Sequence, residues 1–292
     1  TTDRNRTGGR GLFGGGNTPG TTNTIDFVTI ATIGNAQDFG DLTSARQASG
    51  LGSATRGVFG GTGHPNGNIM DYVTFATTSN AVDFGDLQSS LNGKASAANS
   101  TRGIFSGGGT PTPSNEIDFI TIAALGNATD FGNLTVARRN HAGVASPTRA
   151  VFAGGDAAPT TDTIDYITIA TTGNATDFGN LSAARETAGG ASSSTRGVFM
   201  GGYTSGDVDV IEYITIATTG NAQDFGNLSA ARRNGCGVSN NIRGLYAGGF
   251  PAVNTIEFVT IASTGDATDF GDLLTGRLIG TNGASDSHGG LS

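Results

Sequence analysis

The sequence predicts an all-β fold, a six-bladed β-propeller with four antiparallel strands in each blade. One motif recurs six times along the 292 residues, at spacings of 46 or 47 residues. Each copy carries turn residues and short apolar runs that fit four strands. Glycine accounts for 49 residues but lacks the period of three that collagen needs, and isoleucine and phenylalanine recur in fixed slots. A turn-rich repeat of this length is typical of a propeller.

Each copy of the motif opens with arginine, a small residue, an aliphatic residue and an aromatic residue, and a diglycine follows. The six copies start at Arg10, Arg56, Arg102, Arg149, Arg196 and Arg243. A second arginine closes most copies, at Arg46, Arg138, Arg185, Arg232 and Arg277, whereas the second copy has Leu91 there. Leu91 and the nearby Lys94 mark the second copy as irregular, which indicates either a contact edge or decay of the repeat.

The four strands of a blade, a to d, follow from the fourth copy. Strand a is the small-residue segment 141–145, strand b carries Val151 and Phe152, strand c is the apolar run 164–170, and strand d carries Phe178. In strand c, Ile164 and Tyr166 point to one face, whereas Ile167 and Ile169 point to the other. Apolar residues on both faces indicate a sheet that is covered on both sides, and stacked blades provide such cover.

The two ends of the chain predict how the ring closes. The first copy starts at strand b, and residues 277–285 form a strand a without a blade of its own. We expect one domain over residues 1–292, with 277–292 as closing strand and tail that completes the first blade. The first residues are polar and include no initiating methionine, so we expect a processed chain or part of a longer one. Small residues lie four positions after each closing site, where strands converge on the axis: Gly50, Ala95, Ala142, Gly189, Cys236 and Thr281.

Charge, hydropathy and cysteine content limit the partners and the cross-links that we expect for this chain. The net charge is -8, so a phosphate backbone would be repelled and we expect no nucleic-acid partner. No apolar run is long enough to span a bilayer and no basic amphipathic stretch occurs, so we expect no membrane insertion. Cys236 is the only cysteine, which excludes an internal disulfide and fits a buried, small apolar role.

The repeated charged residues are expected to be structural, because a group present in every blade serves what every blade needs. We expect the strand-b arginines to pair with the strand-c acids Asp26, Asp71, Asp118, Asp165, Glu212 and Glu257. One carboxylate per strand-d turn, as at Asp38, favours turn capping over calcium binding. The histidines His64, His141 and His288 show no zinc or copper spacing. We therefore expect no catalytic residue, no metal, no cofactor and no enzymatic activity.

The b–c loops are the variable part of an otherwise repetitive chain, and they open on the same face as the d–a loops. Variable loops on a rigid scaffold are where binding sites usually lie. Tyr203 and Phe250 project aromatic rings from adjacent blades, which suits stacking on a sugar or a protein. The predicted ligand-binding residues are His64, Asn66, Thr110, Tyr203, Asp207 and Phe250. Unselected drift of tolerant loops is the alternative interpretation.

The arrangement of diglycine, strand-c aromatic, strand-d aromatic and closing arginine resembles the Kelch repeat over nearly the whole chain. It departs at strand d, where the Kelch tryptophan is Phe39, Phe84, Phe131, Phe178, Phe225 or Phe270. Kelch-like propellers are mostly binding modules, and a minority that is similar to galactose oxidase carries copper. The wording of residues 164–181 also resembles repeats in virion and tail proteins of bacteriophages, notably marine ones.

These resemblances imply a non-enzymatic binding module of a virion, which recognises a host surface glycan or protein through its b–c loops. The expected partners also include other virion proteins and further copies of the same chain. A purely structural or decorating virion protein is the first alternative. A Kelch-type metalloenzyme is the second, with His64 and Tyr203 as the residues to test. The expected location is the virion, with secretion or the cell surface as alternatives.

Overall fold

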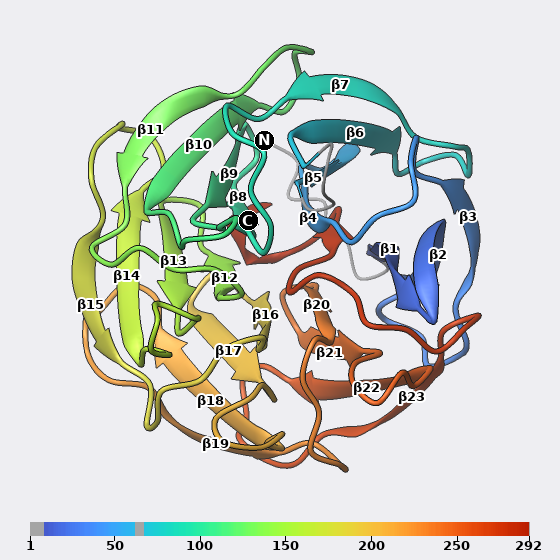
Figure 1. The fold of residues 1–292 in the computed structure, drawn as a ribbon. Coiled ribbons are helices and arrows are strands. Elements are labelled where there is room, and N and C mark those ends of the chain that lie inside the picture. The colour runs from blue at the N-terminus through green and yellow to red at the C-terminus, as the bar shows by residue number, and fades with distance from the viewer. Residues whose placement is uncertain (1–8, 62–66, 292) are drawn as a thin grey trace, which may run out of the picture.

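The computed structural model describes residues 9–61 and 67–291, and these residues form a ring of six four-stranded antiparallel sheets (Figure 1). The predicted six-bladed propeller is therefore confirmed. The innermost strands are β24, β4, β8, β12, β16 and β20, whereas β3, β7, β11, β15, β19 and β23 form the outer rim (Figure 1).

The first three blades each contain strands a to d in spatial order. Blade 1 contains β24 (Ala284–Ser285), β1 (Arg10–Thr18), β2 (Gly20–Thr29) and β3 (Gln37–Asp41). Blade 2 contains β4 (Ser49–Gly52), β5 (Arg56–Gly60), β6 (Ile69–Thr74) and β7 (Val82–Asp86). Blade 3 contains β8 (Ala95–Ala98), β9 (Arg102–Ser106), β10 (Glu116–Thr121) and β11 (Thr129–Asn133).

The remaining blades repeat this order, and a short 3-10 helix lies near the end of the chain. Blade 4 contains β12 (Ala142–Ala145), β13 (Arg149–Ala153), β14 (Thr163–Thr168) and β15 (Thr176–Asn180). Blade 5 contains β16 (Gly189–Ser192), β17 (Arg196–Met200), β18 (Val210–Thr215) and β19 (Gln223–Asn227). Blade 6 contains β20 (Cys236–Ser239), β21 (Arg243–Ala247), β22 (Thr255–Thr260) and β23 (Thr268–Asp272), and the helix η1 spans Gly289–Leu291.

The closing strand lies where the chain ends predict it. β24 pairs antiparallel with β1, so Ala284 faces Leu12 and Ser285 faces Gly11. The first blade is thereby assembled from both ends of the chain, and the ring has no open blade edge at this junction.

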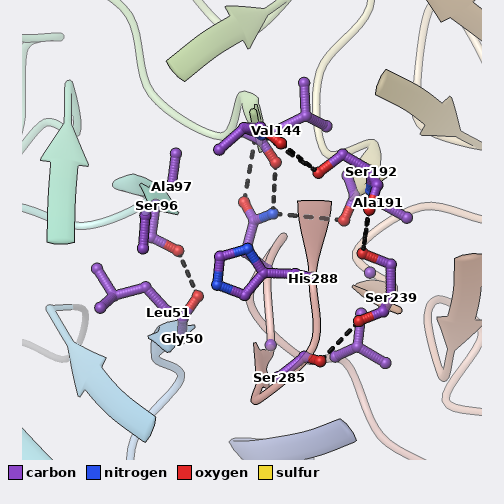
Figure 2. A pocket seen from close by; sticks show the side chains of 18 residues that line it. Gly50, Leu51, Ser96, Ala97, Val144, Ala191, Ser192, Ser239, Ser285 and His288 are labelled. Carbon is purple, nitrogen blue, oxygen red and sulfur yellow. Dashed lines mark hydrogen bonds between the residues drawn. The ribbon is translucent and has the colours of Figure 1, made fainter. Parts of the chain in front are cut away.

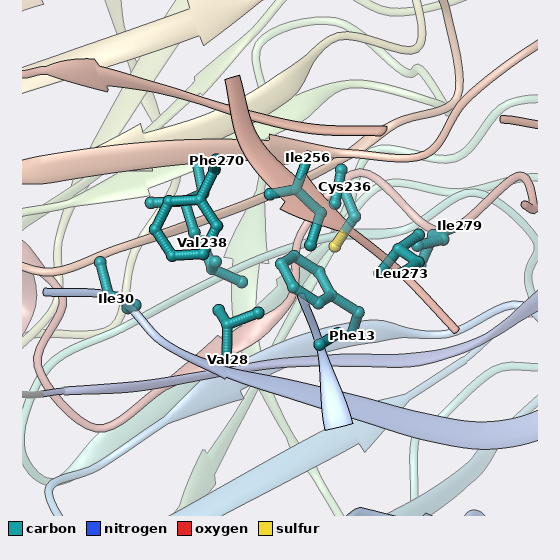
Figure 3. Packing of buried hydrophobic residues seen from close by; sticks show 12 residues of the cluster. Phe13, Val28, Ile30, Cys236, Val238, Ile256, Phe270, Leu273 and Ile279 are labelled. Atoms are coloured by element: carbon teal, nitrogen blue, oxygen red, sulfur yellow. The ribbon is translucent and has the colours of Figure 1, made fainter. Parts of the chain in front are cut away.

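The hydrophobic core is divided into six clusters, one at each junction between adjacent blades. Ile164 and Tyr166 pack toward blade 5, whereas Ile167 and Ile169 pack toward blade 3, as the alternation in strand c predicts. Figure 3 shows the cluster between blades 6 and 1, in which Phe13 lies beside Cys236. Burial raises the pKa of the Cys236 thiol, which fits its role as a small apolar filler.

The arginine that opens each repeat does not pair with the strand-c acid, so that expectation is wrong. Its guanidinium lies over the aromatic ring of strand c in the same blade, as Arg196 does over Tyr213 at 4.2 Å. Arg196 also donates a hydrogen bond from Nη1 to the carbonyl oxygen of Ile261 in the next blade, at 2.9 Å. The ring face attracts the cation and the carbonyl oxygen satisfies its N–H, so this arginine ties two blades together.

The strand-c acid pairs instead with the arginine that closes the preceding repeat. Arg138 Nη2 lies 3.0 Å from Asp165 Oδ2, and both side chains are fully buried. Asp165 also accepts a hydrogen bond from the backbone N–H of Thr135 in the previous blade, at 3.1 Å. The same pairing recurs as Arg46–Asp71, Arg185–Glu212, Arg232–Glu257 and Arg277–Asp26. These acids are structural, as expected, but the sequence assigned them the wrong partner.

Lys94 supplies the cation at the junction of blades 2 and 3, where Leu91 replaces the closing arginine. Its Nζ lies 3.2 Å from Asp118 Oδ2 and 2.9 Å from Glu116 Oε1, and the lysine side chain is fully buried. A lysine stem is flexible, so the ammonium reaches the acid from a position three residues later. The irregularity of the second repeat is therefore a compensated substitution.

The nearly constant c–d turns cover the free edge of the outermost strand in the preceding blade. Asn174 Oδ1 accepts a hydrogen bond from the backbone N–H of Asn133 at 3.1 Å, and Gly173 N–H donates to the Phe131 carbonyl at 2.8 Å. The same side-chain contact recurs at Asn35, Asn80, Asn127, Asn221 and Asp266. Since unpaired strand edges invite aggregation, the fold itself accounts for the constancy of these turns.

Small residues begin the innermost strands, with two corrections to the expected positions. Ala95, Ala142, Gly189 and Cys236 are the first residues of their strands. In blade 2 the first residue of the innermost strand is Ser49 rather than Gly50, because Gly50 faces Phe59 in the same way that Gly143, the second residue of β12, faces Phe152. At the closing strand, the register places Asn282 rather than Thr281 at the position equivalent to Ala142. The d–a connections differ by one residue in length at these two junctions.

The C-terminal segment crosses the axis and plugs it. The Asn282 side chain bonds both backbone groups of Gly143, with Nδ2 donating to the oxygen at 2.7 Å and Oδ1 accepting from the nitrogen at 3.2 Å. Farther along the axis, Figure 2 shows the His288 ring among the innermost strands, and its Nε2 lies 2.7 Å from the Gly52 carbonyl oxygen. Serine hydroxyls link successive strands, as Ser239 Oγ does by donating to the Ser192 carbonyl at 2.9 Å (Figure 2).

Candidate functional site

The b–c loops and the d–a connections lie side by side on one face of the ring, which we call the b–c face. Single β-bridges join them, including Arg139 to Asp156, Glu186 to Tyr203 and Arg233 to Phe250. A residue on a d–a connection is thereby held next to the b–c loop of the following blade. This face combines variable residues from both kinds of connection.

The structure brings together three of the predicted binding residues and separates a fourth. Tyr203 and Asp207 lie in the b–c loop of blade 5 and face each other across a β-bridge, and Phe250 begins the corresponding loop of blade 6. Thr110 is exposed in the loop of blade 3, where its hydroxyl donates to the Gly109 carbonyl at 2.6 Å. His64 and Asn66 lie outside the described residues.

Arg233 is the residue that joins Tyr203, Asp207 and Phe250, and the sequence analysis missed it. The centre of its guanidinium lies 4.6 Å from the Tyr203 ring centroid and 4.5 Å from the Phe250 ring centroid. Its Nη1 lies 3.1 Å from Asp207 Oδ1. We call these four residues the rim cluster. The position after each closing arginine varies along the chain, as Gln47, Asn92, Arg139, Glu186, Arg233 and Leu278, and this variation is the signal that could have revealed Arg233.

The rim cluster is accessible and chemically mixed. The Phe250 residue is 42 % exposed, and the side chains of Arg233 and Asp207 are 30 % and 21 % exposed. One face of each ring is occupied by the guanidinium, so a ligand would meet the remaining faces and edges. Aromatic surface beside a paired arginine and carboxylate suits a ligand that offers both an apolar face and hydrogen-bonding groups.

The equivalent position in blade 4 lacks the aromatic residues and provides an internal comparison. Arg139 pairs with Asp156 at 2.9 Å between Nη2 and Oδ2, and its Nη1 lies 3.4 Å from the Pro111 carbonyl oxygen. Around Arg139, Asp156 takes the place that Phe250 has beside Arg233, and Gly109 of blade 3 takes the place of Tyr203. An arginine–carboxylate pair alone is therefore a recurrent feature of the b–c face, and the aromatic sandwich distinguishes the junction of blades 5 and 6.

The two described histidines are held inside the fold. His141 Nε2 lies 2.9 Å from Ser106 Oγ, and His141 is 1 % exposed. Burial lowers the pKa of His141, and the charges of Arg138 and Lys94 lower it further. Burial also lowers the pKa of His288, which bonds the Gly52 carbonyl group. Within residues 9–61 and 67–291, no three side chains of the His, Cys, Asp or Glu type are grouped so that they could hold a metal ion.

Comparison with known proteins identifies no family for this chain. No protein-family model matches the chain, and no curated protein matches its sequence. Helices of membrane-spanning length and hydropathy do not occur in the described part of the chain.

Proposed function

We propose that this propeller is a non-enzymatic recognition module that binds a surface glycan or protein of a host cell through its b–c face. The observation that carries the proposal is the rim cluster, in which Arg233 is sandwiched between Tyr203 and Phe250 and paired with Asp207. Tyrosine and arginine dominate binding hot spots, and a rigid scaffold lowers the entropy cost of binding. The virion setting rests on the wording of the repeat alone.

The c–d face supports this choice by contrast. Its constant turns are explained by hydrogen bonds to the neighbouring blade, as at Asn174, so their repetition needs no partner. The residues of the b–c face differ from blade to blade, so they do not meet a need that every blade shares. This contrast favours recognition over a purely structural or decorating role, which remains the alternative.

The test compares two arginines at equivalent positions. Labelled protein is bound to a panel of bacterial envelopes and purified surface polysaccharides, as wild type, Arg233→Gln and Arg139→Gln. We expect saturable binding that Arg233→Gln weakens at least about tenfold, as loss of a hot-spot residue does, and that Arg139→Gln leaves within about twofold. Equal effects of the two variants, or none, would refute the rim cluster as the binding site.

The metalloenzyme alternative has its own measurement. Metal analysis of the purified protein would support it if stoichiometric copper were present and lost on His64→Ala or Tyr203→Phe. Envelope binding that persists in both variants would favour the recognition role.

A further inference from the structure

A second candidate site lies on the axis of the ring, at the mouth that opens on the b–c face. A cavity of about 190 Å³ lies where the d–a connections enter the innermost strands. We call it the axial well. Its wall residues Asn92, Asn140 and Asn234 precede β8, β12 and β20, and Asn17 reaches it from the hairpin of β1 and β2. Because a water molecule occupies about 30 Å³ in the liquid, the well can hold a group of several ligand atoms.

The axial well is blind, because the C-terminal segment forms its floor. Thr281 lines the well, and its carbonyl oxygen accepts hydrogen bonds from the backbone N–H groups of Gly190 and Gly237 at 3.4 and 3.2 Å. Asn282 O accepts from the Gly50 N–H at 2.8 Å. The segment is thus bonded to three innermost strands, and the plug around His288 lies beyond it (Figure 2). A ligand would enter from the b–c face alone.

The lining of the axial well is mostly polar, and the described residues that form it include no aspartate or glutamate. Five residues with side-chain amides line it: Asn17, Gln47, Asn92, Asn140 and Asn234. The Asn140 amide is anchored, because its Nδ2 donates a hydrogen bond to Glu186 Oε2 at 3.1 Å. Ser49, Thr187 and Thr281 also line it, and their hydroxyls donate to the Lys94 carbonyl, the Glu186 carbonyl and Asn282 Oδ1. In the part of the chain that the structure describes, the cationic residue of the lining is Lys94, whose ammonium is held by Glu116 and Asp118. Amides can both donate and accept hydrogen bonds, and a hydroxyl that already donates one can still accept another.

The backbone around the well is held in an uncommon conformation. Asn140, Thr187 and Asn234 have φ of 56°, 60° and 55°, and Gly93 has 69° at the same position of blade 3. They are linked blade to blade, because each backbone N–H donates to the preceding carbonyl: Asn140 to Gly93 at 2.7 Å, Thr187 to Asn140 at 2.6 Å and Asn234 to Thr187 at 3.1 Å. A β-branched residue such as Thr187 rarely adopts positive φ, so the ring holds these side chains in place at some cost.

We infer that the axial well binds an uncharged, polyhydroxylated ligand, such as a neutral sugar residue at the end of a glycan. Sugar hydroxyls pair with groups that donate and accept, which the amides supply in a fixed array. Among the described lining residues the one cation, Lys94, is paired with Glu116 and Asp118, so neither an anionic nor a cationic ligand would find an unpaired countercharge there. This inference goes beyond the proposed function, since the well and the rim cluster are separate sites that can fail separately.

The test is a titration of the full chain with methyl glycosides of glucose, galactose and mannose, beside the methyl glycoside of glucuronic acid. Binding is followed by NMR through the side-chain amide signals of asparagine and glutamine. The well variant is Asn140→Gly/Asn234→Gly, because Gly93 shows that glycine fits this position. Arg233→Gln is the matched control at the rim. Asn234→Gly alone and thermal melting verify that the fold persists.

We expect at least one neutral glycoside to shift these signals saturably, with Kd raised at least tenfold by the well variant and unchanged by Arg233→Gln. The inference is overturned if no neutral glycoside binds, if the acidic glycoside binds more tightly than all of them, or if Arg233→Gln abolishes binding and the well variant does not. Loss of envelope binding in Arg233→Gln alone would uphold the rim cluster independently of the well.

Discussion

At the scale of single residues, environment rather than residue type decides what a charge does in this protein. Arg138 and Arg139 are neighbours in the chain, yet the first is fully buried with Asp165 and the second has a side chain that is 35 % exposed. Breaking a buried pair leaves an uncompensated charge without solvent, whereas water replaces a lost partner at the surface.

The two arginines therefore give a matched prediction. Arg138→Met should lower the free energy of unfolding by about 3–5 kcal/mol, because Asp165 stays buried without its cation. Arg139→Met should lower it by less than about 1 kcal/mol. Urea denaturation monitored by circular dichroism measures both. Similar losses for the two variants would contradict the structural role assigned to the closing arginines.

A second residue-scale prediction concerns pH. Burial raises the pKa of Asp118 to about 6, Lys94 opposes this shift, and Glu116 adds to it. Between about pH 4 and 6 the folded state keeps a proton that the unfolded state has released, so this group stabilises the fold below about pH 4 and loses that contribution as the pH rises through 6. Asp118→Asn should remove a decline on the order of 2–3 kcal/mol between pH 4 and pH 7. Denaturation midpoints of both proteins at the two pH values measure it, and parallel pH profiles would refute the assignment.

At the scale of elements, each outermost strand contains a bulge that fits it to the next blade. The register between β14 and β15 shifts between Ile164 and Asp165, and Gly179 in β15 has φ of 148°. A Cβ atom on Gly179 would lie 2.5 Å from the carbonyl oxygen of Gly220 in the next blade. Glycine is required here for both backbone conformation and close approach.

Gly179→Ala should therefore destabilise the protein by about 1–3 kcal/mol or more, through strain and collision with Gly220. Gly206→Ala is the control, because a Cβ there meets open space, and its effect should stay within about 0.5 kcal/mol. Melting temperatures of the two variants check the prediction. An unchanged melting temperature in Gly179→Ala would show that the bulge adjusts.

At the scale of the whole molecule, the C-terminal segment serves both as closing strand and as plug. β24 completes blade 1, Asn282 bonds to blade 4, and His288 bonds to blade 2. In Figure 1 this last part of the chain runs across the centre of the ring. Every blade borders two others, so opening one junction exposes apolar surface on both of its sides.

Ending the chain at Gly283 should lower the melting temperature strongly and make blade 1 sensitive to protease, because β1 loses its pairing with β24 and keeps only β2. Ending it at Gly290 leaves β24 and His288 in place and should preserve both properties. Scanning calorimetry and limited proteolysis with mass spectrometry distinguish these outcomes. A truncation at Gly283 that melts and resists protease like the full chain would mean that the ring is stable without its clasp.

Local patterning by itself determined the architecture: six copies, four strands per copy, strand c apolar on both faces and a blade shared by the two chain ends. These properties depend on residues within one repeat and on the period between repeats, which a single sequence displays. Tyr203, Asp207 and Phe250 were found in the same way, as departures from the repeat.

Only the tertiary structure decided which charged groups meet. Arg233 lies 26 to 30 positions from Asp207 and Tyr203 in the sequence, and contact follows from the stacking of blade 6 on blade 5. Asp165 likewise pairs with Arg138, although the strand-b arginine of its own blade, Arg149, is nearer in the sequence. The axial well is closed at its floor because the C-terminal segment returns to the axis of the ring. Electrostatic and hydrogen-bond partners are determined by distance in space. Those distances depend on how the blades stack in the ring, and the spacing of residues within one repeat does not encode that stacking.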